Sequence, residues 1–276
     1  MKTILVPTDF SKNAENALRY AVDIAKRENA HIVLLHACQT NYSNTDIPYF
    51  EIGDEISKTR KDSDKYLHEL SRKYIHGENV AYETLSMDEF PIDAVLRIVQ
   101  EKEVDLIVMG TKGASGIIGT IFGSNTALVI EKVKCPVLAI PEASTFHEIK
   151  KITYATSYIK SDFECLRKVI EIAEPFKAHL NIVHITDRRN SHEEERRRMD
   201  QFIEEVKVKV PYWNLTCELI YDEDTEQALK NYMDKDPSGL LVMSTHHRDF
   251  FDKIFGKSYT QQMAYHTKTP LLAFHH

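Results

Sequence analysis

Glycines are concentrated between residues 110 and 124, where the sequence reads GTKGASGIIGTIFGS. Five of the nine glycines in the 276-residue chain lie in this stretch. Glycine lacks a Cβ, so a glycine-rich backbone can approach a ligand closely and turn its N–H groups toward it. Ser124 and Asn125 follow the last of these glycines and can either cap a helix or donate to a phosphate oxygen. These residue types predict a phosphate-binding loop. The alternative is a mobile connection.

Asp9, in the segment PTDFS, is a second candidate for ligand binding. A carboxylate there can accept hydrogen bonds from ribose hydroxyls or from an adenine amino group. The alternative is that Asp9 caps the helix that follows it. The glycine-rich stretch is not a Walker A loop, because it lacks the Gly-Lys-Ser/Thr ending. It is also not the dinucleotide-binding fingerprint, which would follow the first strand of the fold.

Short apolar runs alternate with helical patterns and define the elements that hold these residues. The runs IVLL and LIVM are typical of strands buried on both faces of a sheet. Strands that alternate with helices predict an α/β fold, with a mainly parallel, doubly wound, Rossmann-like sheet of five strands flanked by helices. The predicted strands of the first half are 4–7, 32–37, 80–85, 106–109 and 137–140. The predicted helices are 13–27, 55–74, 92–101 and 125–132. Asp9 and Gly110 both follow strands, and ligands bind at that edge of such sheets.

The chain repeats itself once. Residues 2–37 and 150–185 align without a gap, and the pairs 104–110 with 238–244 and 135–140 with 269–274 are also similar. A period of about half the chain predicts two tandem domains, 1–142 and 150–276, joined by a short polar connector. The strands of the second half are expected near 152–155, 180–185, 215–220, 240–243 and 271–274. Histidines recur at 31/179 and 36/184, and this symmetry favours structural roles near strand ends, such as ring nitrogens bonded to the backbone.

The second half lacks the residues that predict ligand binding in the first half. Ser157 stands where the first half has Asp9, Ser244 replaces Gly110, and Lys257 replaces Ser124. The loop STHHRDFFDKIFG keeps a single glycine, Gly256. We therefore predict that this half does not bind a nucleotide as the first half does. The loop also suggests a metal site, but a polar surface loop is favoured over it. Its candidate ligands are His246, His247, Asp249 and Asp252.

Several motifs resemble those of the universal stress protein family. Nucleotide-binding members carry Gly-x2-Gly-x9-Gly-Ser/Thr, which Gly110, Gly113, Gly123 and Ser124 match in full. The segments ILVPTDFS, IVLLHA, DLIVMG and CPVLAIP are also similar to family segments and stand in the family order. The resemblance covers the first half throughout and the second half more weakly. The chain is therefore identified as resembling a tandem member, and its fold as similar to that of the adenine nucleotide alpha hydrolases.

The resemblance implies an ATP site in the first domain, with Mg²⁺ as a further option. Its residues would bind the nucleoside at one end and the phosphates at the start of a helix. The implied binding residues are Pro7, Asp9, Ala37 (through its backbone), Met109, Gly110, Gly113, Gly123, Ser124 and Asn125. We assign no catalytic and no metal-binding residue.

The expected function is ATP binding by a regulatory or signalling protein of the stress response. Hydrolysis should be slow or absent, since no general base stands near the expected phosphates. The first alternative is a weak ATPase or another nucleotide-dependent enzyme, and the second is a ligand-free scaffold for protein interactions. Family members pair through the last strand, so 135–140 and 269–274 are expected to pair as an intramolecular pseudo-dimer. A homodimer through another face is a further option.

Composition sets limits on location and partners. The net charge of −7 disfavours nucleic acid and anionic membranes as partners. The four cysteines, at 38, 135, 165 and 217, show no metal-type spacing and are expected to be reduced. Neither a signal peptide nor a membrane-spanning run is recognised, so a cytoplasmic protein is expected. Residues 38–78 form an insertion-like segment for which a surface excursion is favoured over a lid.

Overall fold

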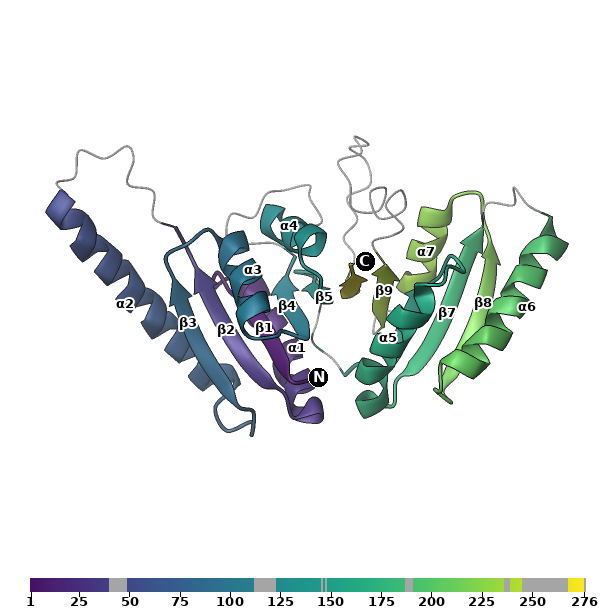
Figure 1. Ribbon diagram of the computed structural model, residues 1–276, viewed down its shortest axis with the longest axis horizontal. Coiled ribbons are helices and arrows are strands. Elements are labelled where there is room, and N and C mark those ends of the chain that lie inside the picture. The colour runs from purple at the N-terminus through teal and green to yellow at the C-terminus, as the bar shows by residue number, and fades with distance from the viewer. Residues whose placement is uncertain are drawn as a thin grey trace. The chain divides into compact units, whose positions relative to one another are not determined.

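The computed structural model describes residues 1–39, 49–111, 123–144, 146, 148–186, 191–235, 239–244 and 268–275. The chain divides into two compact units, Met1–Glu142 and Ala143–His276. Both units are built from parallel strands and helices (Figure 1). The predicted α/β fold with a mainly parallel sheet is thereby confirmed.

The sheet of the first unit has the strand order β3-β2-β1-β4-β5, and every neighbouring pair is parallel. Its strands are β1 (Thr3–Pro7), β2 (His31–Ala37), β3 (Tyr82–Met87), β4 (Leu106–Gly110) and β5 (Val137–Ile140). The chain builds outward from β1 to β3 and then crosses to β4 on the other side of β1. The gap between the carboxyl ends of β1 and β4 is therefore the topological switch point, where open α/β sheets bind ligands.

Four helices cover this sheet. They are α1 (Lys12–Glu28), α2 (Tyr49–Tyr74), α3 (Pro91–Glu101) and α4 (Ser124–Lys132). Helix α1 contacts α2, and α3 contacts α4, which places one pair on each face of the sheet (Figure 1). The apolar positions of α1 recur at helical spacing, and Ala17, Leu18, Ala21 and Ala25 are all buried. The helix stops at Asn29, which adopts the left-handed conformation and donates its N–H to Ala25.

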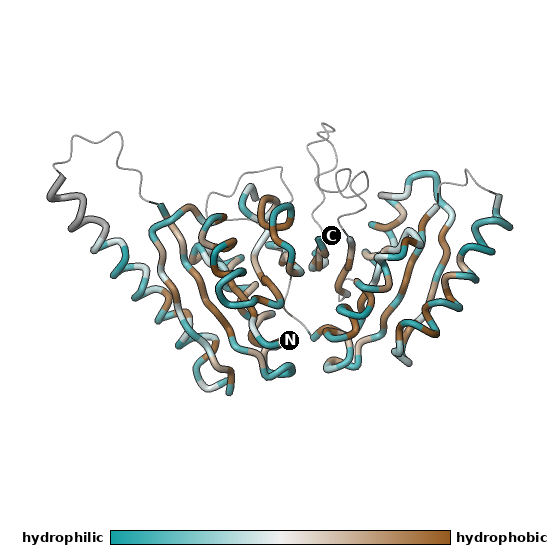
Figure 2. Tube along the Cα trace, in the orientation of Figure 1, coloured by the Kyte–Doolittle hydropathy of each residue, from teal (hydrophilic) through white to brown (hydrophobic). Residues whose placement is uncertain are grey.

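The core of the first unit lies along its central strands. Ile4, Leu5 and Val6 of β1 are fully buried, and the hydropathic colouring shows the same apolar centre in the strands (Figure 2). Strand β3 begins two residues later than predicted, because its register is set by pairing Tyr82 with Ile32 of β2. Helix α2 begins at Tyr49, earlier than predicted. The question of a lid falls partly on residues 40–48, which lie outside the described residues.

The second unit repeats this architecture. Its strand order is β10-β9-β6-β7-β8, again with parallel pairs. Its strands are β6 (Lys151–Ala155), β7 (His179–Thr186), β8 (Leu215–Tyr221), β9 (Leu240–Ser244) and β10 (Leu271–Phe274). Its helices are α5 (Asp162–Phe176), α6 (His192–Lys209) and α7 (Thr225–Asp234). No helix among the residues described is long and apolar enough to cross a membrane.

The repeat extends to the turn after the first strand of each unit. Phe10 and Tyr158 both adopt positive φ, at 64° and 62°. Next to each lies a histidine whose Nδ1 is 2.8 Å from a backbone oxygen, His36 with Thr8 and His184 with Thr156. The predicted backbone-bonding role of this histidine pair is confirmed.

The other recurring pair, His31 and His179, behaves differently. The His31 ring lies 3.4 Å from the Glu83 carboxylate, and the His179 ring nitrogens lie near Asn214 and Thr216. These rings therefore meet side chains at the amino ends of the strands, and among the described residues neither ring bonds the backbone.

Candidate functional site

The predicted site residues that the structure describes lie at one edge of the first unit's sheet. Pro7 ends β1, Ala37 ends β2, and Met109 and Gly110 end β4. Asp9 follows β1 directly, and Gly123, Ser124 and Asn125 form the start of α4. Gly113 falls in 112–122, outside the described residues. The others converge on the switch point because carboxyl ends of parallel strands share one edge.

Asp9 does not cap α1. The N-cap is Ser11, whose hydroxyl accepts the Ala14 N–H at 3.2 Å. Asp9 instead accepts the backbone N–H of Ser11 through Oδ1 at 3.1 Å, which holds the turn between β1 and α1. The capping alternative for Asp9 is therefore wrong. The turn places Asp9 at the carboxyl edge of the sheet, directly after β1.

The start of α4 is held by backbone contacts. Gly123 is the N-cap residue in extended conformation, and its N–H donates to the Thr111 carbonyl at 2.5 Å. Neither Ser124 nor Asn125 is the cap, and both are exposed. Within the described part of the chain, no side chain caps this helix. Its first N–H groups carry the partial positive charge of a helix start, which favours an anion.

Gly110 joins β4 to two helices. Its carbonyl accepts the Thr126 hydroxyl of α4 at 2.8 Å. A Cβ added at Gly110 would lie 2.7 Å from Nδ2 and 2.9 Å from Cγ of Asn13, a buried residue of α1. A side chain at position 110 would therefore have to displace Asn13, whether or not a ligand binds. Packing against α1 is thus a second reason for a glycine at this position.

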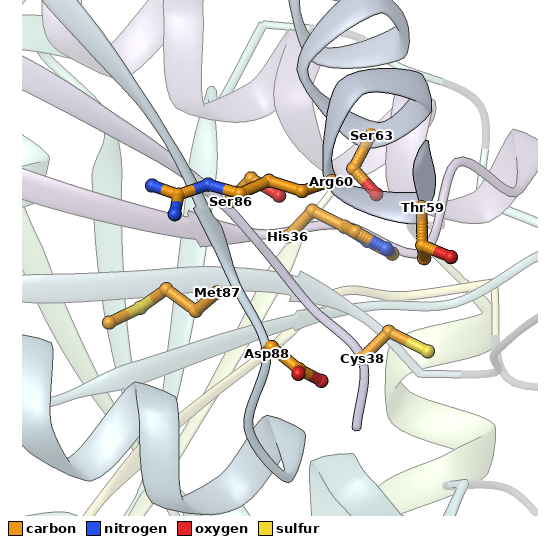
Figure 3. Close-up of a pocket in the computed structure, with 8 residues that line it drawn as sticks. All are labelled: His36, Cys38, Thr59, Arg60, Ser63, Ser86, Met87 and Asp88. Carbon is orange, nitrogen blue, oxygen red and sulfur yellow. The ribbon is translucent and has the colours of Figure 1, made fainter. Parts of the chain in front are cut away.

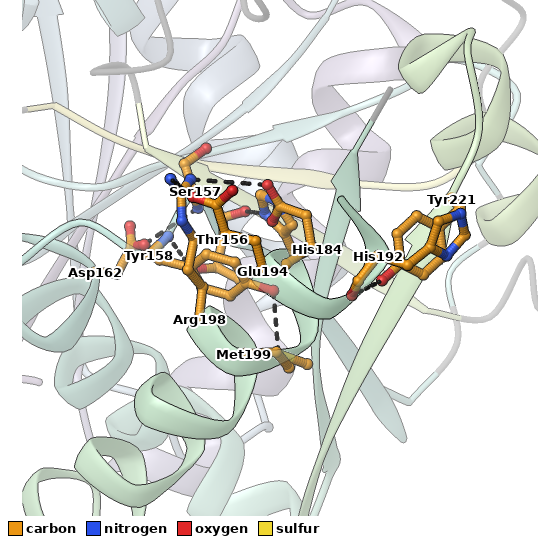
Figure 4. Close-up of polar contacts among 11 residues, drawn as sticks. Thr156, Ser157, Tyr158, Asp162, His184, His192, Glu194, Arg198, Met199 and Tyr221 are labelled. Atoms are coloured by element: carbon orange, nitrogen blue, oxygen red, sulfur yellow. Dashed lines mark hydrogen bonds and ion pairs between the residues drawn. The ribbon is translucent and has the colours of Figure 1, made fainter. Parts of the chain in front are cut away.

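The second unit fills the matching turn with its own side chain. Asp162, fully buried at the start of α5, accepts hydrogen bonds from the hydroxyls of Tyr154 and Thr156, at 2.8 and 2.6 Å. It also accepts the backbone N–H groups of Ser157 and Ile159, at 3.3 and 3.1 Å (Figure 4). Burial, together with this carboxyl group, raises the pKa of Tyr154 far above its usual range.

The first unit has Ala14 at the position of Asp162, so it lacks this carboxylate at the start of α1. Sequence reasoning missed Asp162, although an acidic residue opening the second unit's first helical pattern was the available signal. The two turns share their backbone shape and differ in what fills them. The first unit uses Asp9, and the second uses a buried carboxyl group from the helix.

A small cavity of about 20 Å³, open to solvent, lies under α2 in the first unit (Figure 3). Polar side chains from the ends of β2 and β3 and from α2 surround it. The lining residues are His36, Cys38, Thr59, Arg60, Ser63, Ser86, Met87 and Asp88. Ala37 does not line it. No motif predicted this cavity, because it needs residues from three separate segments.

The described residues contain no group of three or more His, Cys, Asp or Glu side chains that could hold a metal ion. The four candidate ligands named for the loop after β9 lie within 245–267, outside the described residues. None of the four cysteines, all of which are described, forms a disulfide.

Comparison with known proteins identifies the family. A model described as the Universal stress protein family matches residues 1–141. The universal stress protein YxiE of Bacillus subtilis is 33% identical over 144 residues, covering 50% of this chain and 97% of that protein. A universal stress protein of Methanocaldococcus jannaschii is 27% identical over 139 residues, covering 50% of this chain and 81% of the relative.

Solved structures agree on the fold over the whole chain. A universal stress protein from Archaeoglobus fulgidus superposes with a TM-score of 0.70 at 17% identity, covering 99% of this chain and 98% of that one. A protein of unknown function from Pseudomonas aeruginosa gives a TM-score of 0.62 at 14% identity, covering 100% and 92%. With one family domain matched directly and a two-domain fold shared with a solved member, the chain belongs to the universal stress protein family.

Proposed function

We propose that this protein binds ATP in its first unit and acts as a regulatory or signalling protein in the stress response. The observation that carries the proposal is the convergence of Asp9, Gly110 and the start of α4 on one switch point. One universal stress protein has been solved in complex with cAMP, so the family includes a binder of adenine nucleotides.

Each residue has a role in the proposed complex. Asp9 and Pro7 would meet the nucleoside, and the backbone of Ala37 would meet the adenine edge. Met109 and Gly110 would line the ribose. Gly113 would lie against the phosphates, and the start of α4 (Gly123, Ser124 and Asn125) would hold them. The helix start offers N–H groups and partial positive charge, which match a phosphate in geometry and in sign.

ATP is expected to be hydrolysed slowly or not at all. Asp9 accepts the Ser11 N–H in its turn and would meet the nucleoside, so it is not assigned as a general base for the phosphates. Mg²⁺ would then be held mainly by the phosphates and water, as is common for this ion. Any regulatory effect would follow from differences between nucleotide-bound and nucleotide-free forms. A weak ATPase and a ligand-free scaffold remain the competing functions.

Calorimetric titration with ATP and Mg²⁺ tests the proposal. The wild-type chain should bind one ATP, and Gly113→Val should abolish binding, because a side chain would occupy the place of the phosphates. Asp9→Ala should weaken binding at least tenfold. Ser157→Ala, the same position in the second unit, is the matched control and should leave the affinity unchanged.

Three results would contradict the proposal in different ways. Absence of binding at millimolar ATP would favour the scaffold. Normal binding by the Gly113→Val protein would show that the site is misplaced. Turnover of several ATP per second, lost in the Asp9→Ala protein, would favour an enzyme.

Assembly and location are further parts of the proposal. From the resemblance, segments 135–140 and 269–274 are expected to pair within one chain, and a homodimer through another face can be tested by light scattering. The four cysteines form no disulfide in the described structure, which suits a reducing compartment, so a cytoplasmic location is proposed.

A further inference from the structure

The cavity under α2 is lined by side chains that share one face of two neighbouring strands. His36 and Ser86 are register partners on β2 and β3, and Cys38 and Asp88 lie two residues later, directly after the end of each strand. Alternation along a strand places positions i and i+2 on the same face. Helix α2 covers this face with Thr59, Arg60 and Ser63 (Figure 3).

The second unit shows what the fold places at the corresponding point. Helix α6 packs on β8 as α2 packs on β3. In α2, Ser63 is followed by buried residues four and seven positions later, Leu67 and Leu70. In α6, Glu195 is followed at the same spacing by buried Met199 and Phe202. Glu195 therefore stands where the first unit has Ser63.

Glu195 places a carboxylate beside the second unit's histidine. Its Oε2 lies 3.7 Å from Nε2 of His184, and its Oε1 lies 3.7 Å from an Nη of Arg198. The residue is 2% exposed. His184 and Arg198 both appear in Figure 4. Both units share the turn, the strand and the histidine at this place. Only the second unit adds a buried carboxylate, that of Glu195, between His184 and Arg198.

The first unit keeps the histidine but lacks the carboxylate, and Tyr66 stands at the position that matches Arg198. His36 holds Thr8 through Nδ1 as His184 holds Thr156, but its Nε2 makes no hydrogen bond or ion pair with any residue that the structure describes. Ser63 is 7% exposed, and its hydroxyl likewise finds no partner within the described ranges. Arg60, one turn before Ser63 on α2, makes no ion pair with a described residue. In Figure 3 the Ser63 hydroxyl is directed from α2 toward the His36 ring.

We propose that this cavity binds a small free carboxylate, of formate to acetate size, in the place that Glu195 fills in the second unit. The Nε2–H of His36 and the hydroxyl of Ser63 would donate to its oxygens, and Arg60 would supply positive charge. A carboxylate is an acceptor-only group with two oxygens, which suits a set of donors on two elements. The site is independent of the proposed ATP site, because Ala37 does not line it.

Binding is coupled to a proton. The Nδ1–H of His36 is committed to the Thr8 carbonyl, so its Nε2 can donate only when the ring is protonated. The other charged or titratable lining groups are Arg60, Asp88 and Cys38. Asp88 opposes an anion, which favours a singly charged ligand over a doubly charged one.

The test is a titration of the full chain with sodium acetate at pH 6, followed through the imidazole NMR signals and assigned with His36→Gln. The His36 signal should shift and saturate. Ser63→Glu should reduce the acetate response at least tenfold, because the carboxylate of the introduced glutamate would occupy the proposed binding site. Ser57→Glu, an exposed position on the same helix, should change it less than twofold. An unsaturated or absent His36 response in the wild type overturns the proposal.

Two further comparisons sharpen the result. An equal response to chloride or inorganic phosphate at matched ionic strength would overturn the assignment to carboxylates. Displacement of acetate by ATP, or loss of ATP binding in the Ser63→Glu protein, would assign the cavity to the nucleotide site and overturn its independence.

The reverse exchange can be made in the second unit. Glu195→Ser should open a matching cavity beside His184 and lower the melting temperature, and acetate should restore part of the loss. Glu204→Ser, whose side chain is 73% exposed on the same helix, is the control and should show no acetate effect beyond that of the wild type. Equal acetate effects in the two variants would contradict the comparison between the units.

Discussion

The backbone of Gly110 lies directly against the side chain of Asn13, so that a Cβ at position 110 would come within 2.7 Å of Nδ2. This contact joins the end of β4 to the start of α1, next to the switch point. The second unit has the opposite arrangement, with Ser244 on the strand and the smaller Ser161 on the helix. In the first unit the larger Asn13 faces Gly110, whereas the second unit has a serine at both positions.

Gly110→Ala should therefore destabilise the first unit. The added methyl group must displace the Asn13 side chain, and overpacking of this kind costs about 1–3 kcal/mol. The free energy of unfolding in urea measures the effect. The double variant Gly110→Ser with Asn13→Ser copies the second unit and should recover most of the loss. If Gly110→Ala is as stable as the wild type, the contact does not constrain residue 110.

Asp162 should be the most sensitive polar position of the second unit. Asp162→Ala removes the acceptor of four hydrogen bonds and leaves the buried hydroxyls of Tyr154 and Thr156 without it. A loss of about 3 kcal/mol in the free energy of unfolding is expected. Asp200→Ala, at an exposed site on α6, is the control and should cost less than about 0.5 kcal/mol. Equal costs would show that the buried network does not stabilise the unit.

His184 should make stability depend on pH. Burial lowers the pKa of His184, although the Thr156 carbonyl and the Glu195 carboxylate act in the opposite direction. The unfolded chain therefore binds a proton at His184 more readily than the folded chain does. The contribution of His184 to the free energy of unfolding is then present above a pH of about 6.5 and is lost as the pH falls below it. Unfolding in urea at pH 7.5 and pH 5.5 measures the loss.

The matched variant is His184→Asn, whose amide can keep the hydrogen bond to Thr156 but cannot titrate. Its stability should fall less between the two pH values than that of the wild type. An unchanged difference would mean that His184 does not contribute to the pH dependence.

The four thiols should differ in reactivity. Burial raises the pKa of both Cys165 and Cys217 to about 11. At pH 7.5 only about one in 3,000 such thiols is a thiolate, the reactive form. Cys38 is exposed and should react first with Ellman's reagent, in a fast phase that Cys38→Ser removes. Cys165 should react only on unfolding. A fast phase that persists in the Cys38→Ser protein would disprove this order.

Local patterns carried most of the fold. The helical spacing of Ala17, Leu18, Ala21 and Ala25 predicted α1, and the run LIVM predicted β4, because burial of apolar side chains imposes a period on each element. The 148-residue offset between Thr8 and Thr156 likewise predicted two units with the same turn, and both turns adopt it.

Long-range contacts were not predictable in this way. Asp9 was a reasonable helix cap by residue type, but Ser11 takes that place because the positive φ of Phe10 delays the helix. The role of Gly110 depends on Asn13, which lies 97 positions earlier in the sequence. The periodicity of apolar residues in the sequence does not reveal contacts between residues so far apart in the chain.

The sequence by itself determined the α/β class, the duplication and the edge of the sheet at which the described site residues meet. These follow from residue periodicity and from the rule that parallel strands end together. Only the tertiary structure decided that Asn13 packs against Gly110, that Asp162 fills the second unit's turn, and that Ser63 leaves a cavity beside His36 where Glu195 fills the matching place. Those outcomes depend on side-chain volume and charge between segments far apart in the chain, which packing alone brings together.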